Sequence, residues 1–254
     1  MCLAVIATGH HPGLPLIIVH NRDEYHSRPS TPMQWHDQQT YLWGLDRQSK
    51  GTWLGLNHSG YFAFITNYRD PSLNSSTKKS RGGIIPAILK SDLKNPHIIR
   101  NMLKDFSRQT NPFNVIFGQP DTIYYFNSLG QNLIKLPSGI YGLSNSRLNT
   151  PWPKVLNSKN KIRSLCQSNQ ISHATLQQSF QDTQVAPDSM LPDTGVPKQL
   201  ETLLSSVFVQ SPVYGTRSTS SVIWSDSGDI SCQETSWQPD GSMAGCNKFN
   251  ICSQ

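Results

Sequence analysis

Apolar runs separated by short polar turns dominate the first part of the chain. Residues 2–8 and 14–20 are two such runs, and the His-His-Pro-Gly sequence between them is typical of a turn. A short turn between two apolar runs predicts an antiparallel β-hairpin. Because both runs are apolar throughout, we expect both faces of their sheet to be covered.

The rest of the pattern predicts alternating blocks of strands and helices. Short strands are expected at residues 43–44, 52–56, 61–67, 114–117, 122–126 and 139–144, and helices at 82–90, 97–107, 151–168, 172–184 and 198–208. Polar and Pro-containing residues at 27–40 and 69–80 predict loops. Residues 214–224 and 230–237 are typical of a closing hairpin.

Hairpins dominate over strand–helix–strand crossovers in this order of elements. We therefore predict an α+β fold of largely antiparallel sheets with helices outside them. The chain shows no internal repeat and no convincing linker, so residues 1–254 are expected to form a single domain.

Composition and charge narrow the choice of partners. Hydrophobic residues make up 36% of the chain, and six Trp add material for a core. The net charge is +6, but the basic residues are scattered, and Lys78, Lys79 and Arg81 form the nearest approach to a cluster. A solvated loop is the simpler interpretation of that cluster, and a phosphate or nucleotide contact is the alternative. No basic–aromatic stripe is present, so no nucleic-acid partner is expected.

The distribution of apolar residues and cysteines bears on the compartment. No stretch reaches the length of a membrane span, and the apolar N-terminus lacks the basic leader of a signal peptide. The five cysteines, an odd number, include no Cys-x-x-Cys pair. This argues against a disulfide framework and a compact zinc site, so we expect no metal and a reducing compartment. The protein is therefore expected to be soluble and cytoplasmic.

Cys2 is the first candidate for chemistry. Its small side chain allows an aminopeptidase to remove Met1, which would leave a free α-amine beside the thiol. Such an amine has a pKa of about 7.7–8.0 and can act as the base that activates a thiol nucleophile. The alternative is that Cys2 is a small apolar filler of a buried strand.

Asn-Arg-Asp-Glu at 21–24 follows the second apolar run. Because a hairpin returns the end of its second strand to the start of its first, Asp23 is expected to hold or orient the amine of Cys2. Arg22 could lower the pKa of the thiol. The alternative is an ordinary charged turn, but charge at the end of a strand covered on both faces favours a functional site.

Three more polar residues lie at the ends of apolar strands. Asn67 and Asn145 have amides that could donate to a developing oxyanion. Arg217 could bind a substrate carboxylate or phosphate in a fork. The alternatives are turn residues for the two asparagines and a surface or ion-paired residue for the arginine.

These residues fall within a series of short motifs that extends over nearly the whole chain. The motifs are Met-Cys at 1–2, Asn-Arg-Asp-Glu at 21–24, Thr-Trp-Leu-Gly at 52–55, Ile-Thr-Asn-Tyr-Arg at 65–69, Ser-Arg-Gly at 80–82, Gly-Leu-Ser-Asn at 142–145, Thr-Pro-Trp-Pro-Lys-Val at 150–155, Leu-Pro-Asp-Thr-Gly-Val at 191–196, Tyr-Gly-Thr-Arg at 214–217 and Pro-Asp-Gly at 239–241. In their order and spacing they resemble the NRDE family, also called the transport and Golgi organization protein 2 family.

That family is similar to the cysteine N-terminal-nucleophile hydrolases that cleave bile-salt and penicillin amides. The resemblance implies an αββα sandwich of two mostly antiparallel sheets flanked by helices. Carried over to this chain, Cys2 matches the nucleophile and Asp23 the aspartate that orients the amine. Asn67 is a candidate oxyanion donor, Asn145 matches the later asparagine, and Arg217 resembles the arginine on the late strand.

One departure from the amidases concerns the residues before Asp23. Those enzymes carry an arginine where this chain has His20-Asn21, and Arg22 stands directly beside Asp23. Since adjacent residues of a strand face opposite ways, Arg22 is expected to point away from the thiol. Asn21, Arg22 and Arg217 are the candidates for binding a substrate or ligand.

Two functions remain open at this point. The first is an amidohydrolase or thioesterase on acyl substrates that requires no cofactor. The rival comes from the family's association with haem handling and with lipid or acyl-coenzyme A homeostasis. It implies a non-catalytic carrier that uses the same cleft, with haem as a transported ligand and with Arg217 and the Lys78–Arg81 region meeting its anionic groups. A purely structural role would not need the polar residues at the strand ends, and the oligomeric state stays open.

Overall fold

Antiparallel pairing builds both sheets of the protein. The computed structural model describes residues 2–91 and 95–252. The chain divides into two units, of which unit 1 holds the residues up to 27, 138–144 and those from 148 onward, and unit 2 holds 28–137 and 145–147. Each unit is thus assembled from segments that are distant in the sequence.

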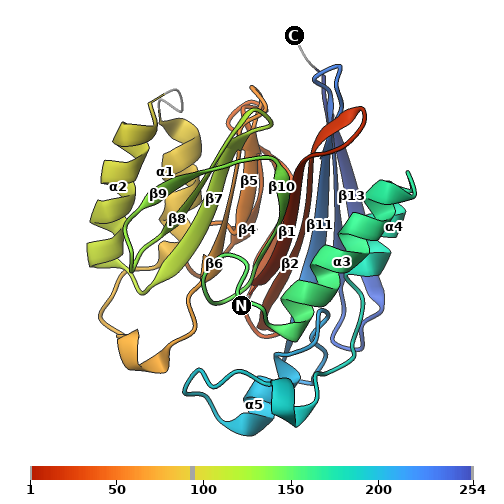
Figure 1. Ribbon diagram of the computed structural model, residues 1–254. Helices are drawn as coiled ribbons and strands as arrows, with labels where there is room; N and C mark the ends of the chain where they lie inside the picture. Colours follow the sequence, from red (N-terminus) through yellow and green to blue (C-terminus); the bar gives the residue numbers. More distant parts are fainter. Residues whose placement is uncertain (1, 92–94, 253–254) are drawn as a thin grey trace. The chain divides into compact units, whose positions relative to one another are not determined.

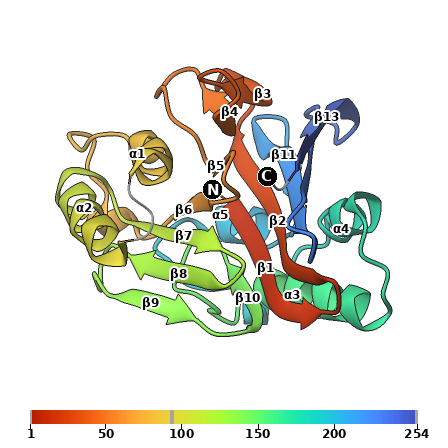
Figure 2. The ribbon, with the colours of Figure 1, turned by 90° about the horizontal axis from the view of Figure 1, so that it is seen from above.

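Unit 1 is a sheet with the strand order β10-β1-β2-β11-β12-β13. Its strands are β1 (Cys2–His11), β2 (Leu14–Tyr25), β10 (Gly139–Leu143), β11 (Tyr214–Trp224), β12 (Ile230–Trp237) and β13 (Met243–Ile251). Its helices are α3 (Pro153–Gln167), α4 (His173–Ser179) and α5 (Lys198–Leu203). Helices α3 and α4 run along one face of this sheet (Figures 1 and 2).

The core beneath those helices follows from the alternation of side chains along β1 and β2. Leu3, Val5 and Val19 lie on the helix-facing side and pack with Val155 and Ile162 of α3. Residues two apart in a strand share a face, so the same side of β2 also carries Asn21 and Asp23 at its end. The helix-facing layer of unit 1 therefore changes from apolar to polar toward the start of β1.

Unit 2 is a sheet in which each strand pairs with the next one along the chain. Its strands are β3 (Ser30–His36), β4 (Tyr41–Asp46), β5 (Leu54–Asn57), β6 (Phe62–Asn67), β7 (Phe113–Gln119), β8 (Thr122–Asn127) and β9 (Leu133–Leu136). Its helices are α1 (Ile84–Lys90) and α2 (Pro96–Gln109), which supply apolar side chains to the core of this sheet (Figure 1).

The structure confirms the α+β class, with two antiparallel sheets that each carry their own helices. Three strands were not predicted. Residues 27–40 contain β3, which is held by pairing with β4 and by burial of Met33. Strands β9 and β13 also form by pairing with a neighbour, although β13 is largely exposed and lacks an apolar alternation.

Two predicted helices are shorter in the structure. The helix expected at 172–184 ends at Ser179, and the one expected at 198–208 ends at Leu203. Whether residues 1–254 act as a single domain stays a prediction. Among the described residues, no helix is both long enough and apolar enough to cross a bilayer.

In unit 2, a close approach of two glycines fixes the segment before α1. A Cβ on Gly51 would lie 2.1 Å from the Cα of Gly82, and the amide of Thr52 donates to the carbonyl of Gly82 at 3.2 Å. Because the obstacle is backbone, a side chain at Gly51 requires a shift of the chain. Gly83 has open space around its missing Cβ.

We predict that Gly51→Ala lowers the free energy of unfolding by about 1–3 kcal/mol, because the new methyl group must displace backbone. Gly83→Ala is the matched control and should be neutral or slightly stabilising. Urea unfolding of both variants measures the difference, and equal stabilities would contradict the close contact.

Candidate functional site

The register between β1 and β2 places Cys2 directly opposite Arg22. Residues that are directly opposite in an antiparallel pair have side chains on the same face. The expectation that Arg22 points away from the thiol is therefore wrong. The next residues of that face are Ala4 and His20, which pair with each other. Cys2, His20 and Arg22 thus share one face of the sheet of unit 1, and Asn21 and Asp23 occupy the other.

Cys2 starts the strand β1 and is only 8% exposed. Burial raises the pKa of its thiol most strongly, and Asp23 adds to that effect. The positive amino terminus and Arg22 act in the opposite direction. Because the net result is a raised pKa, the thiol is protonated at neutral pH and needs a base before it can attack a carbonyl. The hydroxyl of Ser144 donates to the carbonyl of Cys2 at 3.1 Å and ties the start of β1 to the end of β10.

Asp23 is 1% exposed and is held by β11. The hydroxyl of Thr216 donates to its Oδ1 at 2.8 Å and accepts from the amide of Val209 at 2.9 Å. The hydroxyl of Tyr214 donates to the carbonyl of Asp23 at 2.9 Å. Burial raises the pKa of this carboxyl, and Lys154 is the charge that opposes the rise most. The carboxyl is thus fixed in place within unit 1.

The side chain of Asn21 connects β2 to the residues that follow helices α4 and α5. Its amide donates to the carbonyls of Phe180 and Val207 at 3.0 and 2.9 Å, and its oxygen accepts from Thr219 at 2.7 Å. Both amide hydrogens and the oxygen are therefore used inside the protein. We infer an anchoring role for Asn21 in place of the ligand contact expected from the sequence.

Arg217 occupies an irregularity of β11. Thr216 pairs with Asp23 and Ser218 with Arg22, so Arg217 is an extra residue between two consecutive pairs. Such β-bulges redirect a side chain and are common beside active sites. The guanidinium donates to the carbonyls of Tyr25 and His26 at 3.0 and 2.9 Å. Burial, followed by Arg22, lowers the pKa of Arg217, so both cations act on the same region at the end of β2.

Asn67 and Asn145 belong to unit 2, and the structure brings them together there. The amide of Asn145, which is fully buried, donates to the carbonyl of Asn67 at 3.0 Å. The carbonyl of Asn145 accepts from the amide of Arg69 at 2.7 Å. The short segment 145–147 is thereby fastened to the end of β6. The predicted role of the two asparagines as oxyanion donors stays a prediction.

Asn114 is a buried polar residue that the sequence analysis missed. Its amide donates to the hydroxyl of Thr66 at 3.2 Å and to the carbonyl of Ser146 at 2.9 Å. Its oxygen accepts from Tyr125 and Asn127, both at 2.8 Å. Asn114 therefore holds the segment that carries Asn145. The signal in the sequence was a single amide within the apolar run at 113–117.

His20 and Lys154 were also missed as parts of this region. His20 is fully buried, and Lys154 is 2% exposed. Lysine is rarely buried to this degree without a partner. The sequence offered two weak signals for Lys154, which are its place in the motif at 150–155 and its place in the first turn of a helix, where the helix dipole disfavours a cation.

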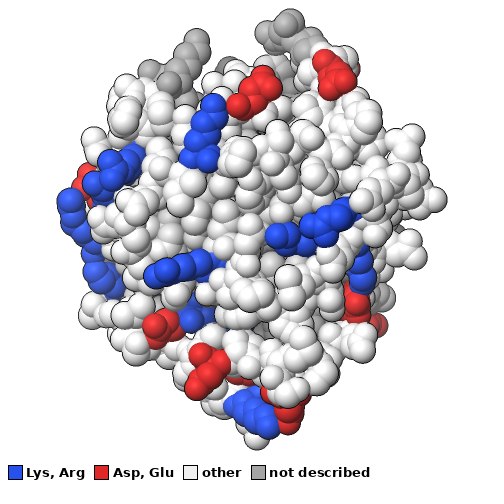
Figure 3. All heavy atoms as spheres, viewed as in Figure 1, with Lys and Arg blue, Asp and Glu red and all other residues white. Residues whose placement is uncertain are grey.

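The basic cluster at 78–81 has a structural explanation. The ammonium of Lys78 donates to the carbonyl of Arg108, and Lys79 donates to Gln109 Oε1 at 2.9 Å. Both acceptors lie in the last turn of α2, where cations are favourable. On the face seen in Figure 3, Lys and Arg are scattered and do not gather into one patch. Among the described residues, no group of three or more His, Cys, Asp or Glu could hold a metal ion.

The chain is similar to known proteins over most of its length. A family model described as Transport and Golgi organisation 2 matches residues 1–239. The Transport and Golgi organization protein 2 homolog of Homo sapiens is 30% identical over 239 residues, which cover 87% of this chain and 86% of that protein. The homolog of Bos taurus is 29% identical over the same length.

A solved structure is similar in fold. It is a variant of the conjugated bile acid hydrolase from Clostridium perfringens, with a TM-score of 0.55 and 10% identity over 98% of this chain and 92% of that one. The similarity confirms that the fold is like that of N-terminal-nucleophile hydrolases.

His20 leads to a prediction about acid stability. Burial, followed by Arg22, lowers the pKa of His20 to about 3 from its ordinary 6.5. The unfolded chain therefore binds the proton between pH 6.5 and about 3 while the folded chain does not, so stability is lost as the pH falls through this range. At about 1.4 kcal/mol per pKa unit, the full loss is roughly 5 kcal/mol. We expect His20→Gln to flatten this part of the stability curve, as measured by urea unfolding from pH 7 to pH 4.

The control for this measurement is His10→Gln, which changes an exposed histidine at the end of β1. It should leave the curve unchanged. If His20→Gln keeps the same dependence on pH as the parent protein, another group is responsible.

Proposed function

Because the chain belongs to the Transport and Golgi organisation 2 family and has a fold like that of N-terminal-nucleophile hydrolases, we propose that Cys2 is the nucleophile of an acyl hydrolase. The observation that carries this proposal is the pairing of Cys2 with Arg22 on one face, with the buried carboxyl of Asp23 on the other face one residue further along β2. Met1, whose removal the proposal requires, lies outside the described residues.

The chemistry follows from the raised pKa of the thiol. In the proposed reaction the α-amine of Cys2 takes the proton of the thiol, and the sulfur forms a bond to the acyl carbon of an amide or thioester. The C–N or C–S bond of the substrate then breaks, and the amine returns the proton to the leaving group. Water completes the cycle by hydrolysing the acyl-cysteine with the same amine as base.

The other candidate residues have distinct parts in this proposal. Asp23 orients the amine, because Thr216 fixes its carboxyl and the register places it one residue beyond the partner of Cys2. Arg22 favours the thiolate as it forms. Asn67 and Asn145 stay the predicted oxyanion donors. Arg22 and Arg217 act at the end of β2, where the acidic Asp23 and Glu24 also lie. The two guanidinium groups are the proposed contacts for an anionic group of the substrate near its acyl carbon.

The alternative is a carrier of haem or acyl-coenzyme A that makes no use of the thiol. In this alternative the basic cluster at 78–81 would contact the anionic groups of the ligand, but Lys78 and Lys79 already bind the end of α2. The buried carboxyl of Asp23 has no evident use in a carrier of an anionic ligand. We therefore favour the hydrolase.

We predict that the purified, untagged protein lacks Met1 and that a reactive acyl ester, such as a p-nitrophenyl ester, adds one acyl group to Cys2. Asp23→Asn should slow this acylation by about 100-fold, since the base is no longer oriented. Intact mass spectrometry followed by peptide mapping measures both results. Cys246→Ala, which removes an exposed cysteine, is the control and should react like the parent protein.

Two outcomes would contradict the hydrolase. One is retention of Met1, because the thiol then has no adjacent amine. The other is acylation that continues at the same rate in Cys2→Ala. In either case a titration with haem or acyl-coenzyme A becomes the next experiment.

A further inference from the structure

The ammonium group of Lys154 lies in surroundings that disfavour a positive charge. It is 2% exposed and lies in the first turn of α3, whose N-cap, Trp152, makes no capping hydrogen bond through its side chain. Burial of a cation costs several kcal/mol, and the amide dipoles at the start of a helix add repulsion. A negative group near the ammonium would offset both effects.

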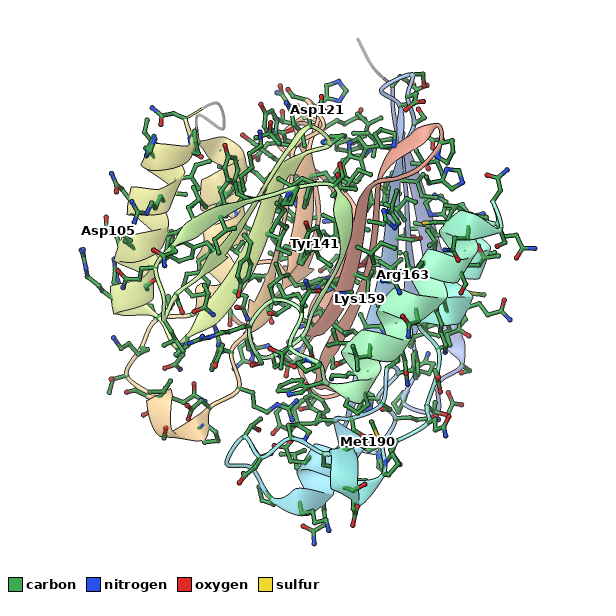
Figure 4. All side chains as sticks on the ribbon, in the orientation of Figure 1. Asp105, Asp121, Tyr141, Lys159, Arg163 and Met190 are labelled. Atoms are coloured by element: carbon green, nitrogen blue, oxygen red, sulfur yellow. The ribbon has the colours of Figure 1, made fainter. Side chains whose placement is uncertain are left out.

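The fold determines which face of the sheet this lysine meets. Helix α3 packs on β1 and β10, and a Cβ on Gly142 would lie 2.6 Å from Val155 Cγ1, so the first turn of the helix is seated closely on β10. This is the helix-facing side of the sheet, which also carries Asn21 and Asp23. Lys159 and Arg163 extend from later turns of the same helix and are less buried (Figure 4).

The electrostatics of Asp23 agree with this placement. Among the charges that act on its carboxyl, Lys154 lowers the pKa most, the amino terminus acts in the same direction, and Glu24 opposes them. The hydroxyl of Thr216 also favours the ionised form by donating to it. Burial outweighs these effects and leaves the pKa raised. Lys154 is thus the charge that most favours the ionised form of Asp23.

We propose that Lys154 is a positioning residue for the N-terminal nucleophile: its ammonium holds Asp23 as a carboxylate, and that carboxylate orients the α-amine of Cys2. The role of the amine rests on the proposed function. The coupling between Lys154 and Asp23 does not, and it can be measured in a protein with no known substrate.

The direct test is the titration of Asp23 by carbon-13 NMR in protein labelled at the aspartate carboxyls, with the signal assigned by its loss in Asp23→Asn. Lys154→Met should raise the pKa of Asp23 by about 1–3, which is the effect of an opposite charge at close range. Lys154→Arg should keep most of the parent value. Lys161→Met is the matched control, since it removes a lysine of the same helix that pairs with Asp182 at 2.7 Å. An unchanged pKa in Lys154→Met would overturn the proposal.

A double-mutant cycle covers the case in which Lys154→Met does not fold, because Asp23→Asn removes the charge that would be left without its partner. The combined variant should then fold, and where both single variants fold it should lose less thermal stability than the sum of the two. A combined variant that stays unfolded, or losses that add, would show that the two residues are independent.

The acylation of Cys2 links this coupling to the reaction. In Lys154→Met the rate of acylation should fall at least tenfold at pH 7, and the rise of this rate with pH should move to higher pH. Lys154→Arg should restore the rate of acylation. If Lys154→Met shifts the pKa of Asp23 but the parent protein is never acylated, the ion pair would be established and the hydrolase would be refuted. Normal acylation at pH 7 in Lys154→Met would refute the positioning role.

Discussion

The pairing of β1 with β2 is the constraint on which the site depends. Side chains alternate between the faces of a sheet, so a register that sets Cys2 opposite Arg22 also decides the side on which His20, Asn21 and Asp23 lie. A slip of one residue would move every one of these groups to the other face. The hydrogen bonds of Asn21 and Asp23 on the helix-facing side oppose such a slip, because it would separate both side chains from their partners.

The burial of ionisable side chains where β1 begins and β2 ends costs free energy. Asp23, Arg22 and His20 are each at least 96% buried, and Lys154 of α3 is buried to a similar degree. Removing charges from water is unfavourable even when they compensate one another, and apolar residues of similar size would often be more stable. Titratable groups that are buried and act on one another concentrate at functional sites. The energetic cost at the start of β1 therefore favours a chemical role over a structural one.

Unit 2 also buries polar groups, but these are neutral amides whose hydrogen bonds are satisfied inside the protein. Asn114 satisfies its amide through four partners and thereby attaches the segment 145–147 to the sheet. A buried amide that lacked these bonds would cost about 1–3 kcal/mol. Asn114 thus bonds to a neighbour of each asparagine that the sequence singled out, which are Thr66 beside Asn67 and Ser146 beside Asn145. A network in which every member is satisfied makes their positions rigid.

Local sequence patterns were enough to predict the first hairpin and the α+β class, and they singled out Cys2, Asp23, Asn67, Asn145 and Arg217 as candidate site residues. These depend on local patterns, which are apolar runs, turn residues and short motifs. The prediction from local patterns was wrong where long-range pairing determines the structure. The polar sequences of β3 and β13 become strands only because a neighbouring strand supplies hydrogen bonds. The orientation of Arg22, the anchoring bonds of Asn21 and the burial of Lys154 come from the tertiary structure alone. Register and helix docking bring together residues more than a hundred positions apart, and no local pattern encodes that arrangement.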